Sequence, residues 1–184
     1  MAQRADVVFR RAGADDAGPV AGLHADSWRR HYRGAYAGAF LDGDVERDRL
    51  QVWSERLSRR DGTTATILAE DDGHVVGFVH VVFDEDDRYG SLIDNLHVVA
   101  DRKRGGIGTQ LMAHAAAAVA ARASGGLYLW VLEQNTAAQA FYEARGGRRA
   151  GRRPVQPPGG VPGRLDGSPA ALRYAWADPA TLVV

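Results

Sequence analysis

The sequence predicts an α/β protein with a mixed sheet, in which an antiparallel meander precedes parallel strand–helix crossovers. Two observations support this prediction. Three β-rich segments follow one another between residues 64 and 99, and strong turn signals such as Asp71-Asp-Gly73 separate them, which is typical of an antiparallel meander. After them, segments with helical and with strand periodicity alternate, which indicates parallel crossovers.

The first third of the chain is expected to form one strand and two helices. Residues 7–11 predict a short strand, and residues 14–32 place apolar side chains at helical spacing. Asp15 and Asp16 suit the first turn of that helix, where acidic side chains are favoured. A Gly- and aromatic-rich connection over 33–41 leads to a second helix. We expect the buried stripe of this second helix to consist of Val45, Leu50, Trp53 and Leu57.

The remaining elements supply the meander and the crossovers. We expect meander strands over 64–70, 74–83 and 91–99, with the acidic run 84–87 as a solvated loop. The middle strand is almost continuously apolar, as in a strand buried on both faces. Beyond the meander we expect a helix from 107 to near 125, a strand over 127–132, a helix over 135–145, a long loop over 152–169 and a last strand over 171–176. No repeat or internal linker interrupts this order, so we expect one domain over residues 1–184.

Composition excludes several classes of function. Lys plus Arg and Asp plus Glu both total 23, so no global basic surface suggests a nucleic-acid partner. No apolar run approaches the roughly 20 residues that span a bilayer, and the N-terminus lacks the apolar core of a secretory signal. We therefore expect a cytoplasmic protein without a membrane partner. The absence of cysteine excludes disulfides, thiolate metal sites and cysteine nucleophiles, and the histidines lack metal-ligand spacing, so we expect no metal.

The strongest functional signal lies in residues 94–111. An apolar strand runs through three basic residues into the turn Gly106-Ile-Gly108, which opens a helix. Such a turn presents backbone N–H groups and a positive helix end at one point, which suits a phosphate ester. A Walker-type loop is excluded because no Lys-Ser/Thr pair follows the glycines, and Leu111 stands where a dinucleotide fingerprint needs its third glycine. A purely structural tight turn is the alternative.

A second motif, Trp130-Val-Leu-Glu-Gln-Asn-Thr-Ala-Ala-Gln-Ala-Phe-Tyr-Glu-Ala-Arg-Gly146, again joins a strand to a helix. Together the two motifs resemble the GNAT superfamily of acyl-CoA-dependent N-acetyltransferases. In that family a Gln/Arg-x-x-Gly-x-Gly/Ala turn binds the pyrophosphate of coenzyme A, and an Asn-x-x-Ala-x-x-Phe-Tyr-Glu-x-x-Gly helix follows. Lys103 replaces the first Gln or Arg, a change that a cradle of backbone amides tolerates. The order of elements agrees over residues 7–176, so the resemblance implies a GNAT-like fold with strands splayed around an acyl-CoA cleft.

The resemblance also implies where acetyl-CoA binds as cosubstrate. Backbone groups of Leu96, His97 and Val98 would pair with the pantetheine amides like an added strand. Asn135 would contact the pantetheine arm, and Tyr142 would lie beside the thioester sulfur. The residues that match the pyrophosphate turn and open the following helix are Lys103, Arg104, Gly105, Gly106, Ile107, Gly108 and Thr109.

The implied reaction is direct transfer of an acetyl group to an amine of a small molecule or peptide, without an acyl-enzyme because no cysteine could carry one. An amine attacks only when neutral, so a base must take a proton, and Asp94 is the first candidate with His97 the second. Strand alternation places Asp94, Leu96 and Val98 on one side and Asn95 and His97 on the other, unless a bulge intervenes. Tyr142 would return a proton to the thiolate, and the Val98 N–H would polarise the carbonyl.

The acceptor side is less defined by the sequence. The position of Trp28, His31, Tyr32 and Tyr36 in the family pattern makes them candidates for acceptor binding. The acidic run 84–87 would attract a cationic amine, whereas Arg148, Arg149, Arg152 and Arg153 would attract an acidic acceptor or the 3′-phosphate of the coenzyme; solvated surface is the alternative for both. Three other functions stay open: a catalytically silent acyl-CoA-binding or sensing domain, transfer of a longer acyl group, and a different nucleotide-binding enzyme. Family members often pair as homodimers, on which the sequence is silent.

Overall fold

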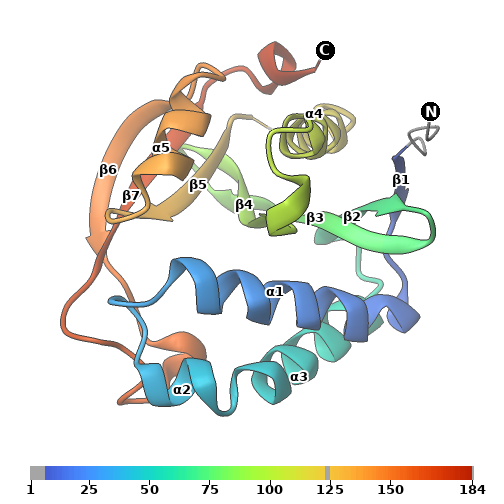
Figure 1. Cartoon of the computed structure of the whole chain (residues 1–184). Helices are drawn as coiled ribbons and strands as arrows, with labels where there is room; N and C mark the ends of the chain where they lie inside the picture. The colour runs from blue at the N-terminus through green and yellow to red at the C-terminus, as the bar shows by residue number, and fades with distance from the viewer. Residues whose placement is uncertain (1–6, 123–124, 184) are drawn as a thin grey trace.

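The computed structural model describes residues 7–122 and 125–183 of the chain. Its central feature is a mixed sheet with the strand order β1-β2-β3-β4-β5-β7-β6 (Figure 1). Strands β2, β3 and β4 form the predicted antiparallel meander, β1 adds to it by pairing antiparallel with β2, and among the described strands one parallel pair joins β4 to β5. The strands span Val8–Arg11 (β1), Thr64–Asp71 (β2), His74–Asp86 (β3), Gly90–Val98 (β4), Leu127–Leu132 (β5), Arg148–Pro154 (β6) and Ala170–Trp176 (β7).

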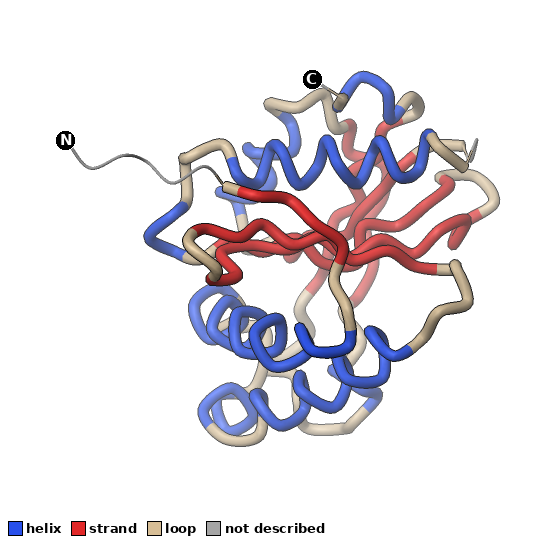
Figure 2. Tube along the Cα trace, turned by 90° about the vertical axis from the view of Figure 1, so that its right-hand side faces the viewer, coloured by secondary structure: helices blue, strands red, loops and turns tan. Residues whose placement is uncertain are grey.

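Helices cover both faces of this sheet. In Figure 1, α1, α2 and α3 lie on one face while α4 and α5 lie on the other, and Figure 2 shows the sheet between these layers. Alternate residues of β3 pack into the two layers: Phe78 lies with the α1 and α3 side chains, and Val79 with those of α4. The continuous apolar pattern of β3 follows from this double burial. The helices span Ala17–His31 (α1), Gly38–Asp42 (α2), Val45–Ser58 (α3), Ile107–Ala120 (α4) and Thr136–Glu143 (α5).

The buried face of α3 differs from the prediction at one position. Leu50 is 46% exposed, whereas its neighbour Arg49 is only 6% exposed. Arg49 shares the buried stripe with Val45 and Trp53 at four-residue spacing, and its guanidinium carbon lies 4.3 Å from the centre of the Trp28 ring. The prediction of Leu50 in the core is therefore wrong, because an aromatic ring and a carboxylate neighbour make this interior suitable for arginine.

One other correction concerns the C-terminal half. The segment from 152 was predicted as loop, but Arg152 to Pro154 complete β6, which pairs antiparallel with β7. Most β6 side chains are exposed at the edge of the sheet, so the strand lacks apolar alternation. The predicted crossovers are confirmed: β4 and β5 pair in parallel, and β5 and β6 run parallel with β7 between them.

The parallel pair β4 and β5 is short, and this positions the site. The two strands pair only over Ser91–Ile93 and Leu127–Leu129, although β4 continues to Val98 and β5 to Leu132. Beyond Ile93 the two strands therefore part, and the edge of β4 that faces β5 is left unpaired. Among residues 7–122 and 125–183, no helix is long and apolar enough to cross a membrane.

Candidate active site

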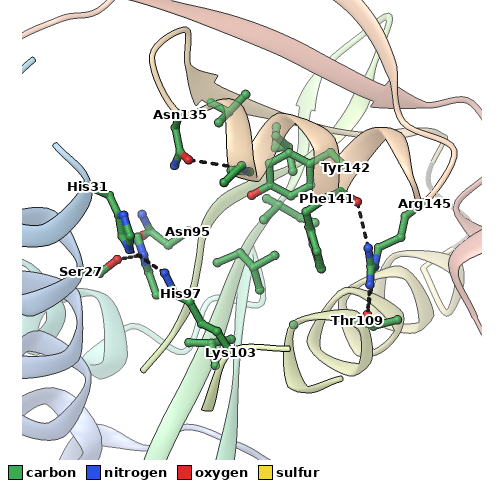
Figure 3. A pocket seen from close by; sticks show the side chains of 18 of the residues that line it. Ser27, His31, Asn95, His97, Lys103, Thr109, Asn135, Phe141, Tyr142 and Arg145 are labelled. Carbon is green, nitrogen blue, oxygen red and sulfur yellow. Dashed lines mark hydrogen bonds between the residues drawn. The ribbon is translucent and has the colours of Figure 1, made fainter. Parts of the chain in front are cut away.

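A cavity of about 650 Å³ opens where β4 and β5 part. Its walls come from both strands, from α1, from the turn that precedes α4 and from α5 (Figure 3). Most residues expected at an acyl-CoA site line this cavity: Asp94, Leu96, His97, Val98, Lys103, Arg104, Gly106, Gly108, Thr109, Asn135 and Tyr142. Two expected members do not, because Ile107 is buried in the core and Gly105 lies in the exposed part of the turn.

The turn before α4 opens one end of the cavity to a ligand. Arg104 and Gly106 adopt left-handed backbone conformations with φ of 67° and 84°. The first i→i−4 hydrogen bond of α4 runs from Gln110 N–H to the carbonyl oxygen of the N-cap residue Gly106 (3.0 Å). The N–H groups that precede Gln110 therefore have no acceptor within the helix. A Cβ added at Gly106 would meet no atom within 4 Å, whereas one at Gly108 would lie 3.3 Å from Phe141. Free N–H groups beside open space suit a phosphate.

The peptide groups of β4 alternate in direction along the cavity. Val99 N–H donates to Val76 O of β3 (2.9 Å). Because successive peptide groups of a strand point to opposite edges, those of Val98 and Leu96 face the cavity and that of His97 faces β3. Two of the three expected backbone contacts are thus oriented for a ligand that adds to β4.

Asp94 occupies a bulge in β4. His80 of β3 pairs with Asn95 while the next residue, Val81, pairs with Ile93, so Asp94 is the extra residue. Arg56 of α3 binds both neighbouring side chains, with Nη1 2.8 Å from Asp94 Oδ2 and 2.9 Å from Asn95 Oδ1. The simple alternation expected for this strand is therefore wrong at Asp94, whose carboxylate shares the α3 side with Asn95.

His97 is held as a neutral imidazole. Its Nδ1 lies 2.7 Å from Ser27 Oγ on α1, and its ring lies 4.7 Å from that of His24. Burial, together with the nearby charges of His31 and Lys103, lowers the pKa of His97 to about 3. At neutral pH the His97 ring is therefore uncharged.

Lys103 reaches across the mouth of the cavity to α1. Its Nζ lies 2.6 Å from His31 Nε2, so the two side chains bridge the turn and the helix. Burial lowers the pKa of both groups, and Lys103 lowers that of His31 further. The turn that was expected to bind a phosphate thus has an additional basic pair beside it.

The helix α5 brings a polar cap and an aromatic hydroxyl to the cavity. Asn135 caps the helix, since its Oδ1 accepts a hydrogen bond from Ala138 N–H (3.2 Å). Tyr142 is buried, and Figure 3 shows its hydroxyl directed into the cavity. Burial raises the pKa of Tyr142 well above its usual value, and the nearby Tyr32 raises it further. Tyr142 therefore keeps its proton at neutral pH and can act as an acid.

Arg145 is a cavity residue that the sequence reasoning missed. Its Nε lies 2.9 Å from Thr109 Oγ1 at the start of α4, and its guanidinium carbon lies 3.6 Å from the centre of the Phe141 ring. Within the described part of the chain, no carboxylate pairs with it. The sequence signal, a basic residue after the last turn of a helix, is too common to single it out.

A second cavity of about 300 Å³ meets the first at the bulge. Tyr32, Asp94, Asn95, Ile93 and Trp130 line both. Of the four residues expected on the acceptor side, Trp28 and Tyr36 line the second cavity, His31 lines the first and Tyr32 lines both. Two ligands could therefore meet at Asp94. No group of three or more His, Cys, Asp and Glu among the described residues could hold a metal ion.

Comparison with known proteins consistently finds N-acetyltransferases. The model of the acetyltransferase (GNAT) family matches residues 25–147. An uncharacterised N-acetyltransferase of Bacillus subtilis, YuaI, is 26% identical over 141 residues, which cover 75% of this chain and 78% of that protein. PaiA N-acetyltransferase from Thermoplasma acidophilum, solved with coenzyme A, matches with a TM-score of 0.73 and 16% identity over 93% of this chain and 99% of its own. The ribosomal-protein-S18-alanine N-acetyltransferase of Escherichia coli matches with a TM-score of 0.65 and 20% identity, over 94% of each chain.

Proposed function

This chain belongs to the GNAT family of acetyltransferases, and from that premise we propose that it transfers an acetyl group from acetyl-CoA directly to an amine of a small molecule or peptide. The observation that carries the proposal is the parting of β4 and β5. It joins a cavity that begins at the amide-rich turn with a second cavity at the bulged Asp94. A long cosubstrate and a separate acceptor can meet there.

The proposed binding mode of acetyl-CoA uses this chain's free backbone groups. The N–H groups at the start of α4 and the basic side chains of Lys103 and Arg145 would bind phosphate oxygens. The unpaired edge of β4 at Leu96 and Val98 would bind the pantetheine amides. That PaiA from Thermoplasma acidophilum was solved with coenzyme A supports this assignment.

The proposed chemistry needs three proton transfers. The acceptor ammonium first loses a proton, which Asp94 would take directly or through a water molecule, so that the neutral nitrogen can form the new N–C bond. As the amide forms, the nitrogen loses its second proton to water. The C–S bond of the thioester breaks, and Tyr142 would donate a proton to the departing thiolate. The Val98 N–H would donate a hydrogen bond to the carbonyl oxygen as it gains charge. Holding both reactants where the two cavities meet supplies orientation.

An acetyltransferase assay tests this proposal. Purified protein is incubated with acetyl-CoA and a panel of amines, and release of free coenzyme A thiol is followed. We expect release that depends on an amine and a faster reaction with acetyl-CoA than with propionyl- or succinyl-CoA. Faster release from a longer acyl-CoA would contradict the acetyl preference. Binding of acetyl-CoA without release for any amine would instead identify a silent binding domain.

A further inference from the structure

We propose that the acceptor is a small amine that also carries a carboxylate, such as an amino acid. The carboxylate would bind to Arg153 and Arg49, while the amine lies at Asp94. This inference rests on the proposed function, because it treats the second cavity as the acceptor site.

The charged side chains of the second cavity are mainly basic. Arg49, Arg56 and Arg153 line it, against the single carboxylate of Asp94. Arg56 is paired with Asp94 at 2.8 Å, so this pair is neutral as a unit. The positive charge that remains comes from the two other arginines.

Arg49 is more than nine-tenths buried, yet its positive charge is only partly neutralised. Its partner Asp48 also binds Arg164, with Arg164 Nη1 2.6 Å from Asp48 Oδ1, so two guanidinium groups share one carboxylate. Both Arg49–Asp48 hydrogen bonds use Nε and Nη2, and no residue described in the structure accepts a bond from Nη1. Because no described residue accepts a hydrogen bond from Nη1, this group can donate to a ligand in the cavity. An anionic group that enters the cavity would accept a hydrogen bond from Nη1 and neutralise the remaining positive charge.

Arg153 of β6 also lines the second cavity. Its guanidinium carbon lies 4.1 Å from the centre of the Trp130 ring, and no carboxylate of the described chain pairs with it. Its neighbour Arg152 instead pairs with Glu133 at 2.8 Å and does not line the cavity. Alternation along β6 therefore separates one arginine that faces the cavity from one that does not. The contact with Trp130 restricts the Arg153 side chain, and its guanidinium can bind a carboxylate through two parallel hydrogen bonds.

The other end of the cavity suits the amine. Among the described residues that line this cavity, Asp94 supplies the one carboxylate, and it lies where the two cavities meet. An ammonium group bound there would lie next to the acyl-CoA cavity. An acceptor with several ammonium groups would instead meet uncompensated arginines, which disfavours polyamines. The cavity volume of about 300 Å³ suits a molecule the size of an amino acid.

The test compares matched acceptors. Free coenzyme A release is measured with the twenty L-amino acids, with their α-amides, which lack the carboxylate, and with spermidine. In parallel, the melting temperature of the protein saturated with coenzyme A is measured with the same compounds. We expect at least one amino acid to be acetylated, and to raise the melting temperature, more effectively than its amide and spermidine.

Two variants locate the effect. Arg153→Gln should raise the KM for the best amino acid by about tenfold, the loss expected for one charged hydrogen-bonded pair, and leave its amide unaffected. Arg152→Gln is the matched control and should change the KM of neither the amino acid nor its amide. The inference is overturned if amides or spermidine are preferred, if no amino acid binds or reacts, or if both variants behave alike. If no amine releases coenzyme A although amino acids still raise the melting temperature, the proposed function fails while the preference for a carboxylate stands.

Discussion

Asp94 Oδ2 lies 2.8 Å from Arg56 Nη1 at the level where β4 parts from β5. This ion pair ties α3 to the bulge in β4, and Arg56 also binds the side chain of Asn95. The carboxylate is thereby placed on the lining of both cavities. We therefore propose Asp94 as the group that receives the proton of the acceptor amine.

The first prediction concerns Asp94. Asp94→Asn should lower kcat by about 10²-fold near neutral pH, the lower end of the usual contribution of a general base. The loss should shrink as pH rises, because an increasing share of the amine is then already neutral. Steady-state kinetics between pH 6.5 and 9.5 measure this. Asp87→Asn, in the exposed hairpin, is the control, and a loss that stays constant across this range would argue against Asp94 as the base.

The second prediction concerns Tyr142. Tyr142→Phe removes only the hydroxyl, so it should lower kcat by about 10²-fold while the Kd for acetyl-CoA stays unchanged. Because burial raises the pKa of Tyr142, the wild-type enzyme should not lose the acid function of this residue below pH 10. Tyr174→Phe is a matched control, since Tyr174 is also buried but donates its hydroxyl to Glu143 (2.6 Å) outside the cavity. Equal turnover of wild type and Tyr142→Phe would remove Tyr142 as the acid.

The third prediction concerns Arg145. Its guanidinium stacks on Phe141 beside the start of α4, where a phosphate is expected. Arg145→Gln should weaken binding of coenzyme A by about tenfold, as for the loss of one charged hydrogen bond. Titration calorimetry with coenzyme A and with dephospho-coenzyme A measures this. An equal loss for both ligands would assign Arg145 to the pyrophosphate, and a loss only for coenzyme A would assign it to the 3′-phosphate. Unchanged affinity for both would exclude Arg145 from the site.

The fourth prediction concerns pH and stability. Burial lowers the pKa of His97 to about 3 and that of His80 to about 4, and it also lowers that of His24. Below about pH 6.5 the unfolded chain therefore binds protons that the folded chain does not. The stability is complete above this pH and falls as pH drops towards 4, by about 1.4 kcal/mol per pH unit for each such histidine.

Urea unfolding at pH 7.5, 6 and 5 measures this decline. His80→Gln should make the pH dependence shallower by the contribution of one histidine, although it also removes the contact of His80 Nδ1 with Thr66 Oγ1 (2.7 Å). His74→Gln, at an exposed position, should leave the slope unchanged. A free energy of unfolding that is constant between pH 7.5 and 5 would contradict the burial of neutral histidines.

The sequence predicted those elements whose burial leaves a strong periodic signal. The strand Leu127–Leu132 was predicted with the bounds that the structure has, because its apolar run is enclosed by turn signals. The edge strand β6 was missed since it consists largely of exposed arginines, and its pairing with β7 depends on tertiary structure. Leu50 was misplaced because hydrophobicity alone could not reveal that Trp28 and Asp48 accommodate Arg49.

The candidate site shows the same division. The glycine turn and Tyr142 belong to motifs that are contiguous in sequence, so both could be found without a structure. The bulge at Asp94 arises because β3 pairs His80 with Asn95 and Val81 with Ile93. No local sequence pattern encodes this pairing. The contact between Arg145 and Thr109 joins residues 36 positions apart and depends on how α4 and α5 pack. The basic lining of the second cavity likewise combines α3 with β6.

Binding of acetyl-CoA by the wild type and by Gly108→Leu tests the central claim most directly. We expect acetyl-CoA at about 100 times its Kd to stabilise the wild type by roughly 2.7 kcal/mol, which appears as a rise in melting temperature that ATP and NAD do not reproduce. Gly108→Leu should lose this rise, because its side chain would occupy the space beside Phe141 at the start of α4. Gly22→Leu, on the exposed face of α1, should keep it. No rise for the wild type, or the same rise for Gly108→Leu, would contradict an acyl-CoA site at this turn.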